Sequence, residues 1–196
     1  MKHKTPFRSR RGFSMVELMV VIGIIVILAG ILIGSLPGIQ AAINRNEIKA
    51  FLAELEDGLS KYQLDNGIYP LNEPSGAGLD DKAGVQGAGV LYKHLSGDFD
   101  LNGEVDFEKN EKIYVQKLDY HSNREARKPR STNAGGEYLV IDAFGDPVRY
   151  LAQPPNLPRG KERLTRSPSY DIWSIAGADP NEADLENKII ANWQGL

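Results

Sequence analysis

An uninterrupted apolar run near the N-terminus constrains this chain more than any other feature. Residues 18–35 read LMVVIGIIVILAGILIGS and contain no charged side chain. A helix of about 18–20 apolar residues is long enough to cross the hydrocarbon core of a bilayer. Cations precede the run and none follows it closely. This asymmetry predicts a single-pass membrane protein whose N-terminus faces the cytoplasm.

An ordinary secretory signal peptide has the same polarity and is the alternative to a permanent anchor. Such a signal is cleaved after its apolar run, at small residues. Here the run continues through residues 38–41 into an amphipathic pattern without a clear cleavage site of that kind. The sequence therefore favours the anchor.

Charge is unevenly distributed along the chain. Residues 1–12 hold five cations and no acid, whereas the whole chain has 23 basic and 26 acidic residues. Removal of this segment would leave 18 basic against 26 acidic residues, a net charge of −8. An acidic remainder argues against nucleic-acid binding, which needs a basic face. The absence of cysteine excludes disulfides, thiolate metal sites and cysteine nucleophiles.

No recognisable catalytic motif supports an enzyme. The three histidines, His3, His94 and His121, are scattered, and His3 lies in the basic N-terminal segment. The sequence contains no GxSxG, HExxH or P-loop signature. We therefore expect no enzymatic activity.

The junction between the basic segment and the apolar run carries a specific motif. Gly12 and the following FSMVELMVVIGIIVILAGI closely resemble the signal of type IV pilins and type II secretion pseudopilins. In that family a prepilin peptidase cuts after the glycine, the new N-terminal phenylalanine is methylated, and the fifth mature residue is glutamate. The resemblance implies cleavage after Gly12, N-methylation of Phe13 and a role for Glu17 in assembly.

The physics of an apolar filament core fits this resemblance. Cleavage would give Phe13 a positive amine, and Glu17 of one subunit could neutralise the amine of its neighbour. Either charge alone is costly in a medium of low dielectric constant, and pairing offsets part of that cost.

The apolar run leads into an amphipathic helix at residues 44–64. Its apolar stripe recurs at steps of three and four residues, as expected for a helix face packed on a sheet. The stripe consists of Ile48, Leu52, Leu55, Leu59 and Tyr62. Asn66-Gly67 and Pro70 predict its end. We expect one helix from about residue 14 to residue 65, half of it in the membrane.

The C-terminal half predicts a small antiparallel sheet. Residues 137–141 and 148–151 are β-prone and flank a Phe-Gly-Asp-Pro turn, which indicates a hairpin, and residues 170–175 predict a third strand. The fold class is therefore α+β, with a long N-terminal helix packed on the sheet.

Several segments outside the N-terminus resemble the G-type major pseudopilin of type II secretion. They are residues 62–70, 142–150, 170–177 and the terminal Asn192-Trp193. Residues 72–136 match only loosely. The expected organisation is a leader at 1–12, a transmembrane and polymerisation helix at 13–36, and a head at 37–196 with a variable insertion at 72–136.

The resemblance implies a structural subunit of a type II secretion pseudopilus or a type IV pilus-like filament. Its expected partners are prepilin peptidase, other copies of itself, other pseudopilins and inner-membrane assembly proteins. It would lie in the bacterial inner membrane, with the head periplasmic, or extracellular after assembly. Two alternatives remain open: a minor pseudopilin at the filament tip, and a monomeric membrane-anchored calcium-binding protein.

Two acidic loops are candidate Ca²⁺ sites. The first has the spacing of an EF-hand-like loop, with Gly103 at the sixth position, although the twelfth position is Lys109 instead of an acid. Its candidate ligands are Asp98, Asp100, Asn102, Glu104 and Asp106. A solvated turn is the alternative.

The second acidic loop lies between residues 176 and 187. G-type pseudopilins carry a calcium loop in this region, and Asp179 matches its first aspartate. The resemblance implies Asp179, Asp184, Glu186 and Asn187 as ligands, and a simple acidic surface loop is the alternative. Oxygen-rich side chains suit Ca²⁺ better than zinc.

Overall fold

The computed structural model describes residues 12–72, 84–109, 111–123, 125–156, 160 and 163–195, apart from the side chains of residues 34–37. The predicted leader, except Gly12, lies outside these residues, and so do residues 73–83 of the predicted insertion. The chain divides into two compact units, residues 1–42 and residues 43–196. The head described below is the second unit.

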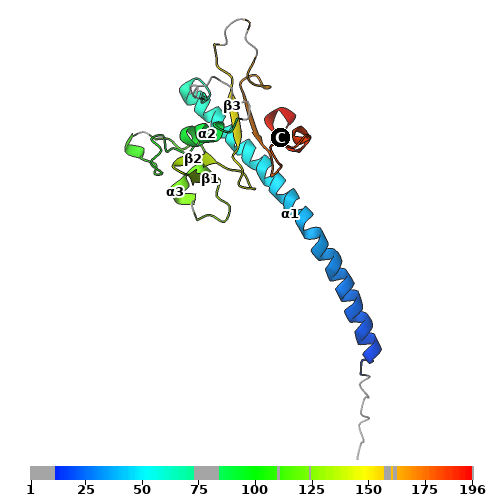
Figure 1. Cartoon of the computed structure of the whole chain (residues 1–196). Helices are drawn as coiled ribbons and strands as arrows, with labels where there is room; N and C mark the ends of the chain where they lie inside the picture. Colours follow the sequence, from blue (N-terminus) through cyan, green and yellow to red (C-terminus); the bar gives the residue numbers. More distant parts are fainter. Residues whose placement is uncertain are drawn as a thin grey trace, which may run out of the picture. The chain divides into compact units, whose positions relative to one another are not determined.

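One helix, α1 (Met15–Asn66), runs through both units and contains 52 residues (Figure 1). It ends where Gly67 takes a positive φ of 79° and donates its backbone N–H to the Gln63 carbonyl at 2.8 Å. Glycine reaches this left-handed conformation without steric penalty. The predicted helix and its predicted end are confirmed.

The apolar stripe of α1 forms the centre of the core of the head. Ile48, Leu52, Leu55 and Leu59 are completely buried, and Tyr62 packs at the edge of the same cluster. Gly58 allows a close approach on this face, because a Cβ there would lie 2.3 Å from Val115 Cγ2.

A second helix, α2 (Gly87–Leu95), packs on the same core. It lies within the region expected to be a variable insertion. That region nevertheless supplies fully or almost fully buried core residues, namely Leu91, Tyr92, Leu95, Val115 and Leu118. The described part of this region is therefore integral to the core of the head.

The strands form two small antiparallel sheets. The first pairs β1 (Ser131–Ala134) with β2 (Glu137–Val140), and the second has the order β3-β4-β5. The bounds of the second sheet are β3 (Arg149–Ala152), β4 (Tyr170–Ser174) and β5 (Ile190–Ala191). Figure 1 shows β1, β2, α2 and α3 (Tyr120–Asn123) gathered on one side of the head portion of α1, and the C-terminal segment on the other.

Short helical turns complete the head. They are η1 (Phe107–Lys109), η2 (Gln116–Leu118), α4 (Leu185–Lys188) and η3 (Asn192–Gln194). The α+β architecture predicted from the sequence is confirmed.

The predicted hairpin of residues 137–141 with 148–151 forms only beside its turn, and its strands pair elsewhere beyond that point. The chain does reverse there, but only an isolated bridge joins Ile141 to Pro147 before β3 turns to pair with β4. The Asp142 carboxylate closes this turn and connects it to β4. Its Oδ1 accepts the backbone N–H groups of Phe144 and Asp146, and its Oδ2 accepts the Ser174 hydroxyl at the end of β4.

Two contacts hold the part of α1 where the head begins. Arg45 Nη1 donates to the Lys188 carbonyl at 2.8 Å, and Lys128 Nζ donates to Glu47 Oε2 at 2.5 Å. The hydrogen bond from Lys128 lowers the pKa of the Glu47 carboxyl below its usual value, because it stabilises the ionised form. Residues far apart in the sequence therefore converge on one turn of α1.

Candidate functional site

The candidate processing site lies just outside the helix. Gly12, Phe13 and Ser14 precede α1, and Phe13 is 79% exposed. No heavy atom outside its chain neighbours lies within 4 Å of an added Cβ at Gly12. The Gly12–Phe13 peptide bond is therefore accessible in the isolated chain.

Ser14 and Glu17 form a capping box at the start of α1. The backbone N–H of Val16 donates to Ser14 Oγ at 3.3 Å, and the backbone N–H of Ser14 donates to Glu17 Oε2 at 2.9 Å. The first backbone hydrogen bond of the helix runs from Leu18 N–H to the Ser14 carbonyl at 3.1 Å. Reciprocal bonds of this kind satisfy N–H groups that a helix start leaves unpaired. They also place the carboxylate of Glu17 beside the first residues of α1.

The helix that follows has the length and composition of a membrane span. Within the described residues, α1 is the one helix that meets both conditions. Its large apolar side chains from Leu18 to Ile33 are exposed in the isolated chain, each by 45% or more. Exposed apolar surface on this scale requires a lipid or protein environment.

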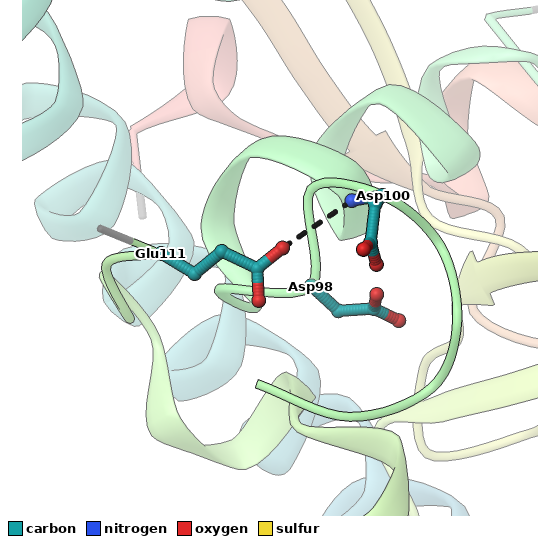
Figure 2. Close-up of side chains that lie close together, drawn as sticks. All are labelled: Asp98, Asp100 and Glu111. Carbon is teal, nitrogen blue, oxygen red and sulfur yellow. Dashed lines mark hydrogen bonds between the residues drawn. The ribbon is translucent and has the colours of Figure 1, made fainter. Parts of the chain in front are cut away.

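In the first acidic loop, the structure brings three carboxylates together. Single oxygen atoms of Asp98, Asp100 and Glu111 lie within 4.8 Å of one another (Figure 2). Asp98 is 1% exposed and accepts hydrogen bonds from Tyr92 Oη and from the backbone N–H groups of Asn102 and Gly103. Burial raises the pKa of the Asp98 carboxyl, and the donated hydrogen bonds only partly oppose this effect.

Glu111 is the member of this group that the EF-hand spacing leaves out of register and that was therefore not among the predicted ligands. Its Oε1 accepts the backbone N–H groups of Phe99 and Asp100, and its Oε2 accepts that of Asp106 at 2.6 Å. Glu111 stands two residues beyond the position where an EF-hand supplies its bidentate acid. The short helix η1 precedes it, and no long exiting helix fixes the usual register there. A search for acids one or two residues past the twelfth position would have found it.

The remaining predicted ligands of this loop have other roles. Asn102 Oδ1 accepts the Glu104 N–H, and Asp106 Oδ1 accepts the Glu108 N–H. Lys109, at the twelfth position, lies 3.0 Å from Asp100 and 3.5 Å from Asp106. Its hydrogen bond to Asp100 lowers the pKa of that carboxyl. The donor set is made of hard oxygen atoms, which fits Ca²⁺, with Glu111 in addition to the predicted residues.

The second acidic loop does not gather its predicted ligands. Among the residues that the structure describes, only the group around Asp98 has three acidic or histidine ligand atoms this close together. Asp184 lies 3.4 Å from Lys188, and Glu186 pairs with Arg166. Asp179 accepts the Asn181 N–H at 2.9 Å. The Asn187 backbone N–H donates to the Asp184 carbonyl. This set does not fit a metal site as the side chains lie.

Comparison with known proteins extends the resemblance seen in the sequence. A family model described as the prokaryotic N-terminal methylation motif matches residues 7–33. Type II secretion system core protein G of Klebsiella michiganensis is 37% identical over 78 residues, which are 40% of this chain and 55% of that protein. Type IV wide pilus major component PilA4 of Thermus thermophilus is 36% identical over 66 residues, 34% of this chain and 50% of that protein.

In these two matches the chain spans about half the length of the relative. A longer match joins it to type II secretion system core protein G of Pseudomonas aeruginosa, at 26% identity over 193 residues. That alignment covers 95% of this chain and 96% of that protein. No solved structure matches the chain. The motif, the long helix and the relatives agree: the chain carries the prokaryotic N-terminal methylation motif and is similar to type IV pilins and, most of all, to G-type pseudopilins of type II secretion.

Proposed function

We propose that the chain is a structural, non-enzymatic subunit of a type II secretion pseudopilus or of a pilus-like filament. Prepilin peptidase cleaves it after Gly12, and Phe13 is then N-methylated. The observation that carries the proposal is the junction itself. An accessible Gly12–Phe13 bond directly precedes an apolar helix, and Glu17 stands in the first turn of that helix.

Assembly follows from the same geometry. Transfer of the apolar side chains of α1 from the bilayer into water is unfavourable, so the helix needs another apolar environment, which the helices of other copies supply. The Glu17 carboxylate pairs with the Phe13 amine of a neighbouring copy, so that neither charge is left alone in the filament core. Other pseudopilins and inner-membrane assembly proteins complete the machine, and the head faces the periplasm.

Two observations favour a filament shaft over the alternatives of a tip subunit or a monomeric calcium-binding protein. The relatives are named core protein G and major pilus component. The chain also has the glutamate that the charge pair needs.

The intact mass and N-terminal sequence of the protein extracted from host membranes test processing. We expect a chain that begins at N-methyl-Phe13. A chain that keeps residues 1–12, or that begins beyond residue 36, would contradict the proposal. Replacement of Gly12 by a bulky residue should leave the precursor uncut, because the peptidase must accommodate that residue beside the scissile bond.

We also propose that the first acidic loop binds Ca²⁺ through Asp98, Asp100 and Glu111, with Asn102, Glu104 and Asp106 nearby. The support is the convergence of three carboxylates around a buried one. A bound divalent cation would compensate the charge of Asp98, whose described partners are uncharged donors. Calcium would stabilise the loop; we assign it no catalytic role.

Calcium titration of the full-length chain in detergent micelles tests this site. Glu111→Gln should weaken calcium binding by roughly tenfold or more, since a loop-closing carboxylate is lost. Glu108→Gln is the matched control, because Glu108 is an exposed acid of the same segment and belongs to no such group. Equal affinities of the two variants, or no calcium binding by the wild type, would count against the site.

A further inference from the structure

Lys188 directly follows the C-terminal acidic loop of residues 176–187. It is the last residue of α4, and its ammonium group forms ion pairs with Glu182 Oε1 and with Asp184 Oδ1. The backbone carbonyl of Lys188 also accepts the hydrogen bond from Arg45. Lys188 thus links Glu182 to Asp184 through its side chain, and it links this segment to α1 through its backbone carbonyl.

The other acids of this segment also have partners within the chain. Glu186 pairs with the Arg166 guanidinium, which lies 5.0 Å from the centre of the Trp193 ring. Asp179 accepts both the backbone N–H and the side-chain amide of Asn181. Positive charge in the described part of this loop is therefore supplied by side chains of the chain itself.

We propose that the Lys188 ammonium is the resident cation of the C-terminal acidic loop, in place of a divalent metal ion. Glu182 and Asp184 repel each other, and a cation between them removes that repulsion. The hydrogen bond to Glu182 raises the pKa of Lys188 above its usual value, so that the ammonium stays charged. A calcium ion needs six to eight oxygen ligands. To bind here it would also have to displace the ammonium of Lys188, which is held beside Asp184 by the helix α4 that connects the two residues.

Under this proposal the two acidic loops of the head differ in the cation that neutralises them: the Lys188 ammonium in the C-terminal loop, and Ca²⁺ in the loop around Asp98. The segment of residues 179–191 is ordered by a covalently attached charge and is independent of the calcium concentration. The group around Asp98 has a partly exposed lysine beside it, but its buried carboxylate receives only uncharged donors. The inference about Lys188 does not rest on filament formation or on calcium binding at Asp98.

Hydrogen exchange measured by mass spectrometry on the full-length chain in micelles tests the proposal. Peptides covering residues 179–191 are followed in EGTA and in millimolar Ca²⁺. In the wild type we expect the same exchange in both conditions. Lys188→Gln should exchange about three to five times faster in EGTA, in line with the modest strength of exposed ion pairs. Lys188→Arg, which keeps the charge, should remain close to the wild type.

Peptides from the buried stripe of α1, residues 48–59, serve as the folding control and should stay equally protected in all three proteins. Slower exchange of residues 179–191 in the wild type on calcium addition would overturn the proposal, because the resident cation would then be a metal ion. Unchanged exchange in Lys188→Gln would overturn it as well, because the ammonium would then not contribute to the stability of residues 179–191.

Discussion

Glu17 serves two purposes that can be separated at the level of single atoms. One carboxylate oxygen accepts the Ser14 N–H of its own chain, while its negative charge is the group proposed to meet a neighbouring amine. A capping box tolerates either glutamate or glutamine, because only an acceptor oxygen is needed. A charge pair tolerates glutamate alone.

Glu17→Gln should therefore keep the helix start and lose the charge pair. We expect normal membrane insertion and processing and a loss of most filaments. Glu17→Ala loses both functions, and the missing cap should further weaken the first turn by about 0.5–2 kcal/mol. Filament yield in sheared fractions is the measurement. Normal filaments from Glu17→Gln would falsify the charge-pair account.

Gly103 is required by the backbone and by a neighbour. Its φ is +90°, and a Cβ would lie 2.7 Å from Tyr138 Oη. Gly103→Ala should lower the free energy of unfolding by about 1–3 kcal/mol. Gly89 lies inside α2, where a Cβ meets only ordinary contacts at 3.7 Å. Gly89→Ala should raise stability by about 0.5–1 kcal/mol. Chemical denaturation in micelles measures both changes, and effects of the same sign would contradict the argument.

Among elements, α1 supplies Ile48, Phe51, Leu52, Leu55 and Leu59 to the core. Leu55 is completely buried, whereas Leu64, on the same helix, is 80% exposed. Leu55→Ala should destabilise the head by about 2–5 kcal/mol, through lost transfer energy and the cavity left behind. Leu64→Ala should change stability by no more than about 0.5 kcal/mol. The two midpoints of denaturation form a matched comparison, and similar shifts would show that α1 is not the centre of the core.

The sequence predicted α1 well because periodicity is a local property. The steps of three and four residues define the buried face, and Gly67 defines the end. Strand pairing is not local. The β-prone segments around Asp142 were found, but their partners were not, since the Ser174 hydroxyl that binds Asp142 lies 32 residues further on. The helix α2 was missed because three glycines, Gly84, Gly87 and Gly89, fall within six positions at its start, and glycine disfavours a helix.

The same distinction holds for the candidate sites. The processing motif depends on neighbours in the sequence and was predicted in full, although its cleavage stays a prediction. The acidic group depends on a loop that folds back on itself. Spacing alone identified Asp98 and Asp100, whereas Glu111 lies outside the EF-hand spacing and is brought to them by the path of the backbone.

For the whole molecule, acid should act on the head through carboxyls whose pKa values are shifted in opposite directions, as Glu47 and Asp98 illustrate. The pKa of Glu47 is lowered in the folded state, so its ion pair contributes stability above the unfolded pKa and loses it as the pH falls through the folded value. The pKa of Asp98 is raised above its ordinary 3.8, so the folded state binds that proton more tightly. Without calcium, protonation of Asp98 therefore stabilises the head as the pH falls through its raised pKa.

Calcium affinity should fall as the pH is lowered, because protons compete with the ion for the Asp98 carboxylate. Titrations of the full-length chain at pH 7 and pH 5 should show weaker binding at the lower pH. Asp98→Asn should bind calcium poorly at both. Calcium binding by Asp98→Asn as tight as that of the wild type would exclude Asp98 as a ligand.

The convergence of distant residues on one turn of α1 has a mechanical consequence. Arg45 and Glu47 stand at the entry of the helix into the head and are held by residues 188 and 128. A force that pulls the head against α1 would load these two contacts before it reached the buried stripe. These two contacts would break first, whereas the buried side chains from Ile48 to Leu59 would have to be pulled out of the core together. The head would thus yield slightly at its edge before it detaches from its helix.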